Sequence, residues 1–179
     1  MIKRLILLLF VSFLLIHCSD CKTDKEQKID TSKIKEYVDL LLTNWHRAAS
    51  EANFENYFGA MDSVSIFIGT DASEIWSKKE FEAFSKPYFD KGKAWDFKTL
   101  DRNIYTNNSG NFVWFDELLI TWMGTCRGSG VLEKTDNKWK IKHYVLSVPI
   151  PNDDINTIIA AKKEKDSIFL QKNYKDKLD

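Results

Sequence analysis

The sequence predicts an α+β domain in which about three helices pack on one curved antiparallel sheet, followed by a C-terminal helix. Two observations support this fold class. Apolar residues recur at helical spacing in the first part of the chain, whereas the second part consists mainly of runs typical of strands. Helices and strands segregated in this way usually form helices laid against a single antiparallel sheet.

The first predicted helix is the longest. Apolar residues between positions 34 and 49 repeat at helical spacing and form one stripe. Thr31 or Ser32 stands at its N-cap, where a side-chain oxygen accepts a hydrogen bond from a free backbone N–H of the first turn. Aromatic residues within 54–58 then predict a short second helix packed beside the first.

A strand and a third helix follow. Residues 64–68 are rich in β-branched and aromatic side chains and lead into a Gly-Thr-Asp turn, which predicts a strand. Ser77 and Glu80 form a capping box, because each can satisfy a free backbone N–H at the start of a helix. This third helix is expected to stop between 87 and 92.

Four strands complete the predicted sheet as a meander, and the third of them bends at its glycines. The other three are expected at 95–105, 112–123 and 139–148. Alternation in the last strand predicts that His143 points into the domain. In the second of the four, Asp116 and Glu117 point to opposite faces, and Glu117 is expected at the solvent or at a subunit interface.

The first 17 residues have the features of an export signal. Lys3 and Arg4 precede an apolar run of 12 residues at 5–16. That run is too short to cross a bilayer, for which about 20 residues are needed. We therefore expect a cleaved signal peptide at 1–17.

The junction after this signal resembles a bacterial lipobox. Cys18 would become the lipidated first residue of the mature chain, and His17 stands where lipoboxes have Gly, Ala or Ser. Residues 18–31 are polar and without periodicity, which predicts a tether. We expect a membrane-anchored lipoprotein of the bacterial cell envelope, with plain secretion or a retained anchor as alternatives.

Charge and composition exclude several classes of function. The chain has 26 basic and 26 acidic residues, and removing the signal takes away two basic residues and no acidic one, which leaves a net charge of −2. This balance gives no reason to expect nucleic-acid binding. The three histidines are scattered, and no phosphate loop or zinc motif is present, so we predict neither a metal nor a cofactor.

Residues 153–179 are predicted to form a helical appendage. Asn152 or Asp153 caps this helix, and its apolar stripe fades after Ala161. The appendage either frays, docks weakly, covers the mouth of a pocket or helps to form a dimer.

Two stretches near the end of the meander resemble a known family. Arg-Gly-Ser-Gly-Val-Leu-Glu-Lys at 127–134 and the segment 139–154, which begins Trp-Lys-Ile-Lys-His, are similar to the closing signature of SnoaL-like domains in the nuclear transport factor 2-like superfamily. The resemblance implies a cone-shaped domain at 32–152 with a pocket at its wide end. It also implies that homodimers form by pairing of sheets, and it leaves the activity open.

Asp116 and His143 are the candidates for proton transfer. The resemblance implies this role, because a pocket Asp or His abstracts a proton next to a carbonyl in the enzymatic members. Burial would suit Asp116 to that task by raising the pKa of its carboxyl group. The alternatives are an ion pair between Asp116 and Arg127, a contact of Asp116 with a bound ligand, and a core role for His143.

The expected ligand site is an aromatic cavity. Core packing explains most of its rings without a ligand, but in this fold the core and the pocket wall are continuous. The side chains assigned to it are Trp45, Tyr57, Trp76, Phe84, Trp114 and Arg127. We weigh three functions in this order: binding of a small apolar or amphipathic ligand, a homodimeric interaction module with a vestigial pocket, and an isomerase, cyclase or hydratase.

Overall fold

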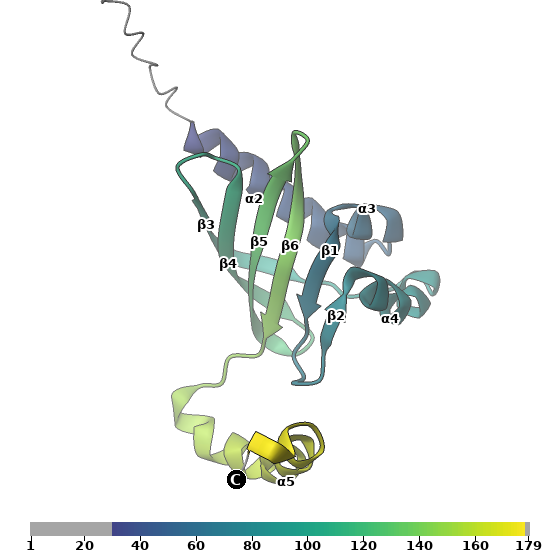
Figure 1. Ribbon diagram of the computed structural model, residues 1–179, viewed down its shortest axis with the longest axis vertical. Helices are drawn as coiled ribbons and strands as arrows, with labels where there is room; N and C mark the ends of the chain where they lie inside the picture. The colour runs from purple at the N-terminus through teal and green to yellow at the C-terminus, as the bar shows by residue number, and fades with distance from the viewer. Residues whose placement is uncertain (1–29, 178–179) are drawn as a thin grey trace, which may run out of the picture.

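A computed structural model describes residues 30–177, in which one curved six-stranded sheet is covered on one face by three helices (Figure 1). The predicted signal peptide, Cys18 and most of the tether lie outside the described residues. The helices are α2 (Thr31–Ser50), α3 (Phe54–Gly59), α4 (Lys78–Asp90) and α5 (Ile155–Tyr174), with short 3-10 turns η1 (Asn152–Asp154) and η2 (Lys175–Lys177). The strands are β1 (Met61–Ile68), β2 (Ile75–Ser77), β3 (Lys98–Thr106), β4 (Phe112–Thr121), β5 (Gly124–Thr135) and β6 (Lys138–Ser147).

The helix starts follow local capping chemistry. The capping box of Ser77 and Glu80 at the start of α4 is confirmed, with both reciprocal hydrogen bonds present. The cap of α2 is Asp30, whose carboxylate accepts from the Lys33 N–H, and not Thr31 or Ser32. Asp30 thus satisfies a free N–H of the first turn, and the helix begins one residue earlier than expected.

The sheet is mixed, which corrects the expectation of a wholly antiparallel one. Its order is β2-β1-β6-β5-β4-β3, and β1 pairs with β6 in parallel while every other pair is antiparallel. Parallel neighbours need a long connection, and here the whole segment from β2 to β5 lies between the two strands.

A β-bulge decides which residues of β6 face the helices. Val131 pairs with His143 and Leu132 with Ile141, so Lys142 is an extra residue on β6. The bulge inverts the alternation after Ile141, because side chains follow a period of two along a strand. Tyr144 is therefore buried under the helices and His143 lies half-buried on the other face, so the predicted inward position of His143 is wrong.

Aromatic rings fill the space between the sheet and the helices. Trp45 on α2 stacks on Tyr57 of α3 with their ring centres 4.9 Å apart, and the edge of Tyr144 meets Trp45 at the same distance. Phe81 of α4 stacks on Phe67 of β1 at 3.9 Å. Rings in such contact bury large areas and stabilise the core.

The C-terminal helix α5 lies apart from this core. None of its described residues is buried, and its main contacts are with the adjoining turns η1 and η2 (Figure 1). Within residues 30–177, no helix is both long and apolar enough to cross a membrane.

Candidate functional site

The polar centre of the domain is the carboxylate of Glu117 on β4, which is 1% exposed. Its Oε1 accepts hydrogen bonds from the His46 ring at Nε2 and from the Tyr144 hydroxyl, each at 2.8 Å. Its Oε2 accepts from Arg102 Nε at 2.9 Å and lies 2.8 Å from Arg102 Nη2. We call His46, Arg102, Glu117 and Tyr144 the Glu117 cluster.

Arg102 on β3 ties this cluster to α2. Its Nη1 donates to the Asp39 carboxylate at 2.8 Å and to the Thr43 hydroxyl at 3.1 Å, while Nη2 donates to Thr99 at 3.0 Å. With the two contacts to Glu117, each nitrogen of the guanidinium has a partner. Arg102 is therefore committed to holding the helix on the sheet.

A glycine on the neighbouring strand makes room for the cluster. Gly128 of β5 pairs with Glu117, and a Cβ atom at Gly128 would overlap the Tyr144 hydroxyl and lie 2.9 Å from Glu117 Oε1. A larger residue there would displace the hydrogen bond between Tyr144 and Glu117. The glycine is thus required by close approach, and not only by the curvature that the sequence predicts.

The electrostatics of the cluster keep Glu117 ionised. Burial alone would raise the pKa of its carboxyl group, but the hydrogen bond and charge of His46 together with the charge of Arg102 outweigh burial and lower that pKa. Burial, followed by the negative charge of Glu117, raises the pKa of Tyr144 well above 10.0. A fully paired carboxylate of low pKa is poorly suited to act as a general base.

The predicted exposed position of Glu117 is therefore wrong. The alternation correctly placed Asp116 and Glu117 on opposite faces but could not say which face the helices cover. One signal could have helped: Arg102 lies two residues before Ile104 in a predicted strand, so both point to the same face. An arginine on the apolar face of a strand needs a buried acid as its partner.

The candidate catalytic residues lie on the face of the sheet that the helices leave open, here called the outer sheet face. Asp116 is half-buried there and accepts a hydrogen bond from Asn103 at 3.3 Å. It pairs with Ser129 on β5, whereas Arg127 is exposed and pairs with Leu118. Among the described residues no ion pair joins Asp116 to Arg127, so that prediction is wrong.

The structure does not bring Asp116 and His143 together. Asp116 is on β4 and His143 on β6, with β5 between them. Strands two places apart are about 10 Å apart in a sheet. Within residues 30–177, no group of three His, Cys, Asp or Glu side chains is arranged to hold a metal ion.

The six residues predicted to line one pocket are divided among three regions. Trp45 and Tyr57 are buried in the core. The rings of Trp76 and Phe84 stack with their centres 4.7 Å apart near the β2 edge. Trp114 and Arg127 lie on the outer sheet face, where Trp114 stacks on Tyr105 with ring centres 5.8 Å apart.

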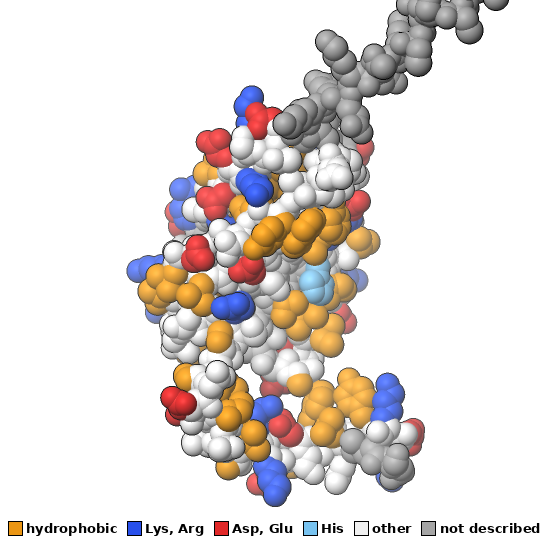
Figure 2. All heavy atoms as spheres, turned by 90° about the vertical axis from the view of Figure 1, so that its left-hand side faces the viewer, with side chains coloured by type: hydrophobic (Ala, Val, Ile, Leu, Met, Phe, Trp, Pro, Cys, Tyr) orange, Lys and Arg blue, Asp and Glu red, His pale blue; other side chains and the backbone are white. Residues whose placement is uncertain are grey.

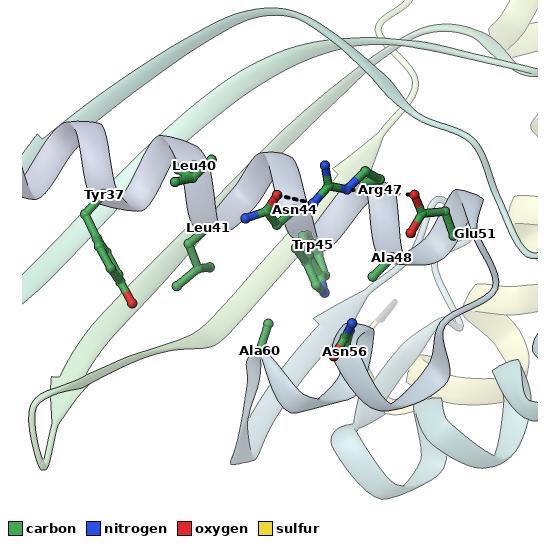
Figure 3. A pocket seen from close by; sticks show the side chains of 10 residues that line it. All are labelled: Tyr37, Leu40, Leu41, Asn44, Trp45, Arg47, Ala48, Glu51, Asn56 and Ala60. Carbon is green, nitrogen blue, oxygen red and sulfur yellow. Dashed lines mark hydrogen bonds and ion pairs between the residues drawn. The ribbon is translucent and has the colours of Figure 1, made fainter.

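Three concave surfaces flank α2 in the described structure, one of them against Ile104 and Tyr105 of β3. A groove of about 430 Å³ between α2 and α3 includes Trp45 in its lining (Figure 3). Another, of about 460 Å³, lies between α2 and the start of β3 and reaches His46 and Arg102. The groove that reaches His46 is lined by side chains of the Glu117 cluster together with Asp96, Phe97 and Lys98.

Known proteins resemble this chain at the level of its fold. An NTF2-like protein of unknown function from Pseudomonas putida KT2440 superposes with a TM-score of 0.59 and 11% identity, covering 70% of this chain and 92% of that one. An NTF2-like protein from Cytophaga hutchinsonii ATCC 33406 gives a TM-score of 0.55 and 16% identity, over 64% and 98% of the two chains. The association domain of C. elegans CaMKII superposes with a TM-score of 0.55 and 19% identity, covering 65% of this chain and 97% of that one.

The sequence itself matches one family profile. No curated protein sequence matches the chain. The profile of the SnoaL-like domain, however, matches residues 38–151, which span the elements from α2 to β6. This protein therefore belongs to the SnoaL-like domain family and has the NTF2-like α+β fold.

Proposed function

We propose that this domain is a homodimeric interaction module in which two copies pair through their outer sheet faces. The observation that carries the proposal is the apolar character of that face. Trp114 is 44% exposed and Tyr105 is 42% exposed, although both belong to the regular part of the sheet. Large apolar patches on a folded domain usually mark an interface.

The strand register defines the outer sheet face. One row of paired residues crosses it from Ile66 through His143, Val131 and Trp114 to Tyr105. The apolar members of the face are Ile66, Ile68, Tyr105, Phe112, Trp114, Leu118, Ile120, Val131 and Val145. Figure 2 shows hydrophobic side chains gathered around a histidine on the side of the molecule that it presents.

Two of the charged residues on this face, Asp116 and Arg127, fit a two-fold pairing. Asp116 and Arg127 form no ion pair with each other in the described chain. In a two-fold dimer every contact occurs twice: if one residue of the first copy meets a second residue of the other copy, the reverse contact also forms. Asp116 of each copy would then pair with Arg127 of the other, which adds specificity to an apolar interface.

The interior supports an interaction module over the two alternatives. A small-ligand pocket in the cone would need the space that the rings of Trp45, Tyr57 and Tyr144 occupy. An enzyme using Asp116 or His143 would need its catalytic side chain inside a cavity, and both residues lie on an open face of the sheet. The association domain of C. elegans CaMKII has a similar fold, which supports a role in association for this one.

The proposed signal peptide and Cys18 would place this module at the bacterial cell envelope. The tether would enter the domain at the start of α2, where the described chain begins. The support for this attachment is the apolar run and the cysteine of the N-terminal sequence.

Sedimentation velocity of the purified protein tests the interface with a matched pair of tyrosines. Tyr105 on the outer sheet face and Tyr88 on α4 are 42% and 48% exposed. We expect a dimer for the wild type and for Tyr88→Asp, and a monomer for Tyr105→Asp. A monomeric wild type, or a dimer that survives Tyr105→Asp unchanged, would refute the proposal.

A further inference from the structure

We propose that the groove between α2 and α3 binds a small neutral carbonyl compound, whose oxygen accepts a hydrogen bond from the indole N–H of Trp45. This site is separate from the proposed dimer interface, because it lies on the side of the sheet that the helices cover. It would stay open in a dimer formed through the outer sheet faces.

The groove is lined by both apolar and polar side chains, and the indole of Trp45 lies at its base. Leu41 and Ala48 of α2 face Ala60 across it, and Asn56 of α3 lies at its floor (Figure 3). The indole nitrogen of Trp45 is turned toward Asn56 and Ala60. The volume of about 430 Å³ suits a small organic molecule.

The donor at this base has no partner. Trp45 is 2% exposed, and its Nε1 is a buried atom without a hydrogen bond among the described residues. The ring cannot turn away easily, because Tyr57 stacks on one side and the edge of Tyr144 meets it. Indole is a donor only, and a buried donor without an acceptor is costly, so a ligand that fits must supply an acceptor.

The charged side chains at the rim indicate a neutral ligand. Arg47 donates to Asn44 at 2.8 Å and lies 3.9 Å from Glu51, so its charge is already engaged. Tyr37 and Leu40, both exposed, add apolar surface at the mouth. An aromatic or aliphatic ketone, ester or amide combines the acceptor and the apolar body that this groove requires.

The occupant is not expected to come from this chain. The tether at 18–31 contains a single large apolar side chain, Ile29, so it offers little to the apolar part of the lining. Helix α5 follows the end of β6 and lies away from α3 (Figure 1).

NMR of the indole N–H signals tests the site directly. The chain has six tryptophans, and Trp45→Phe identifies the Trp45 signal in ¹⁵N-labelled protein. Acetophenone is the probe, and ethylbenzene is its carbonyl-free analogue. We expect acetophenone to move the Trp45 indole proton downfield saturably, and ethylbenzene to bind about tenfold more weakly because it forms no hydrogen bond.

A groove-filling variant separates binding from non-specific contact. Ala60→Leu fills the part of the groove that the indole nitrogen faces and should abolish the shift that acetophenone causes, whereas Ala83→Leu on the exposed side of α4 should leave it intact. An unmoved Trp45 signal, an Ala60→Leu variant that responds like the wild type, or equal binding of the two probes would overturn the proposal. Monomeric protein would not affect this outcome, so the site and the dimer are tested independently.

Discussion

Two neighbouring acidic residues on β4 illustrate how differently the two faces of this sheet are organised. Glu117 points under the helices, where three side chains and the space left by Gly128 satisfy it completely. Asp116 points to the outer sheet face and accepts one hydrogen bond, from Asn103. The Glu117 cluster on the inner face is closely paired, whereas the outer face exposes large apolar side chains such as Trp114 and Tyr105. We infer that the inner face stabilises the domain and that the outer sheet face forms the dimer interface.

The largest effect is expected when the acid of the inner face is removed. Glu117→Ala leaves the buried Arg102 without its carboxylate, and breaking one side of a buried pair costs about 3–5 kcal/mol. Asp116→Ala should cost less than about 0.5 kcal/mol of monomer stability, as is usual for surface substitutions. Urea unfolding of both variants at matched protein concentrations measures the difference. Equal losses would remove the distinction between the two faces.

A second test uses the space that Gly128 provides. Gly128→Ala places a methyl group against the Tyr144 hydroxyl and Glu117, and overpacking of this kind costs about 1–3 kcal/mol. Gly59 at the end of α3 is the control, because a Cβ atom added there would have no neighbour within 4 Å. Gly59→Ala should leave the unfolding midpoint unchanged or raise it. A Gly128→Ala variant as stable as the wild type would show that the cluster tolerates displacement.

A smaller effect concerns pH. The pKa of Glu117 is lower in the folded protein than its ordinary value of 4.5, so the unfolded state binds more protons as the pH falls. The stability that this carboxylate contributes is present above pH 4.5 and is lost as the pH falls through its folded pKa. The titratable groups that face the Glu117 carboxylate are the side chains of His46, Arg102 and Tyr144. Thermal unfolding temperatures between pH 6 and pH 3 should fall less steeply for Glu117→Gln than for the wild type, and parallel curves would contradict this account.

The sequence reveals most of the fold because most of its signals are local. The stripe of α2, the capping box at Ser77 and the strand meander each depend on neighbours in the chain, and all appear in the structure. The parallel pairing of β1 with β6 joins segments far apart in sequence and has no local signature. The short strand β2 is likewise defined by its partner β1.

The candidate site was harder to predict, because one extra residue can invert a strand. The bulge at Lys142 exchanges the faces of His143 and Tyr144, and no composition change marks it. Glu117 was predicted at the solvent for the same reason, because alternation does not tell which face of the sheet the helices cover. Alternation gives the relative orientation of neighbours, and only long-range packing gives the absolute one.

The most direct test of the account is a charge-exchange experiment on the outer sheet face. In a two-fold dimer with reciprocal contacts, Asp116→Arg and Arg127→Asp each place like charges opposite one another, which opposes pairing. Mixing the two variants restores opposite charges at both contacts. Sedimentation velocity should therefore show monomers for each variant alone and a dimer for the equimolar mixture. If all three samples sediment as the same species, two copies of this chain do not meet through these residues.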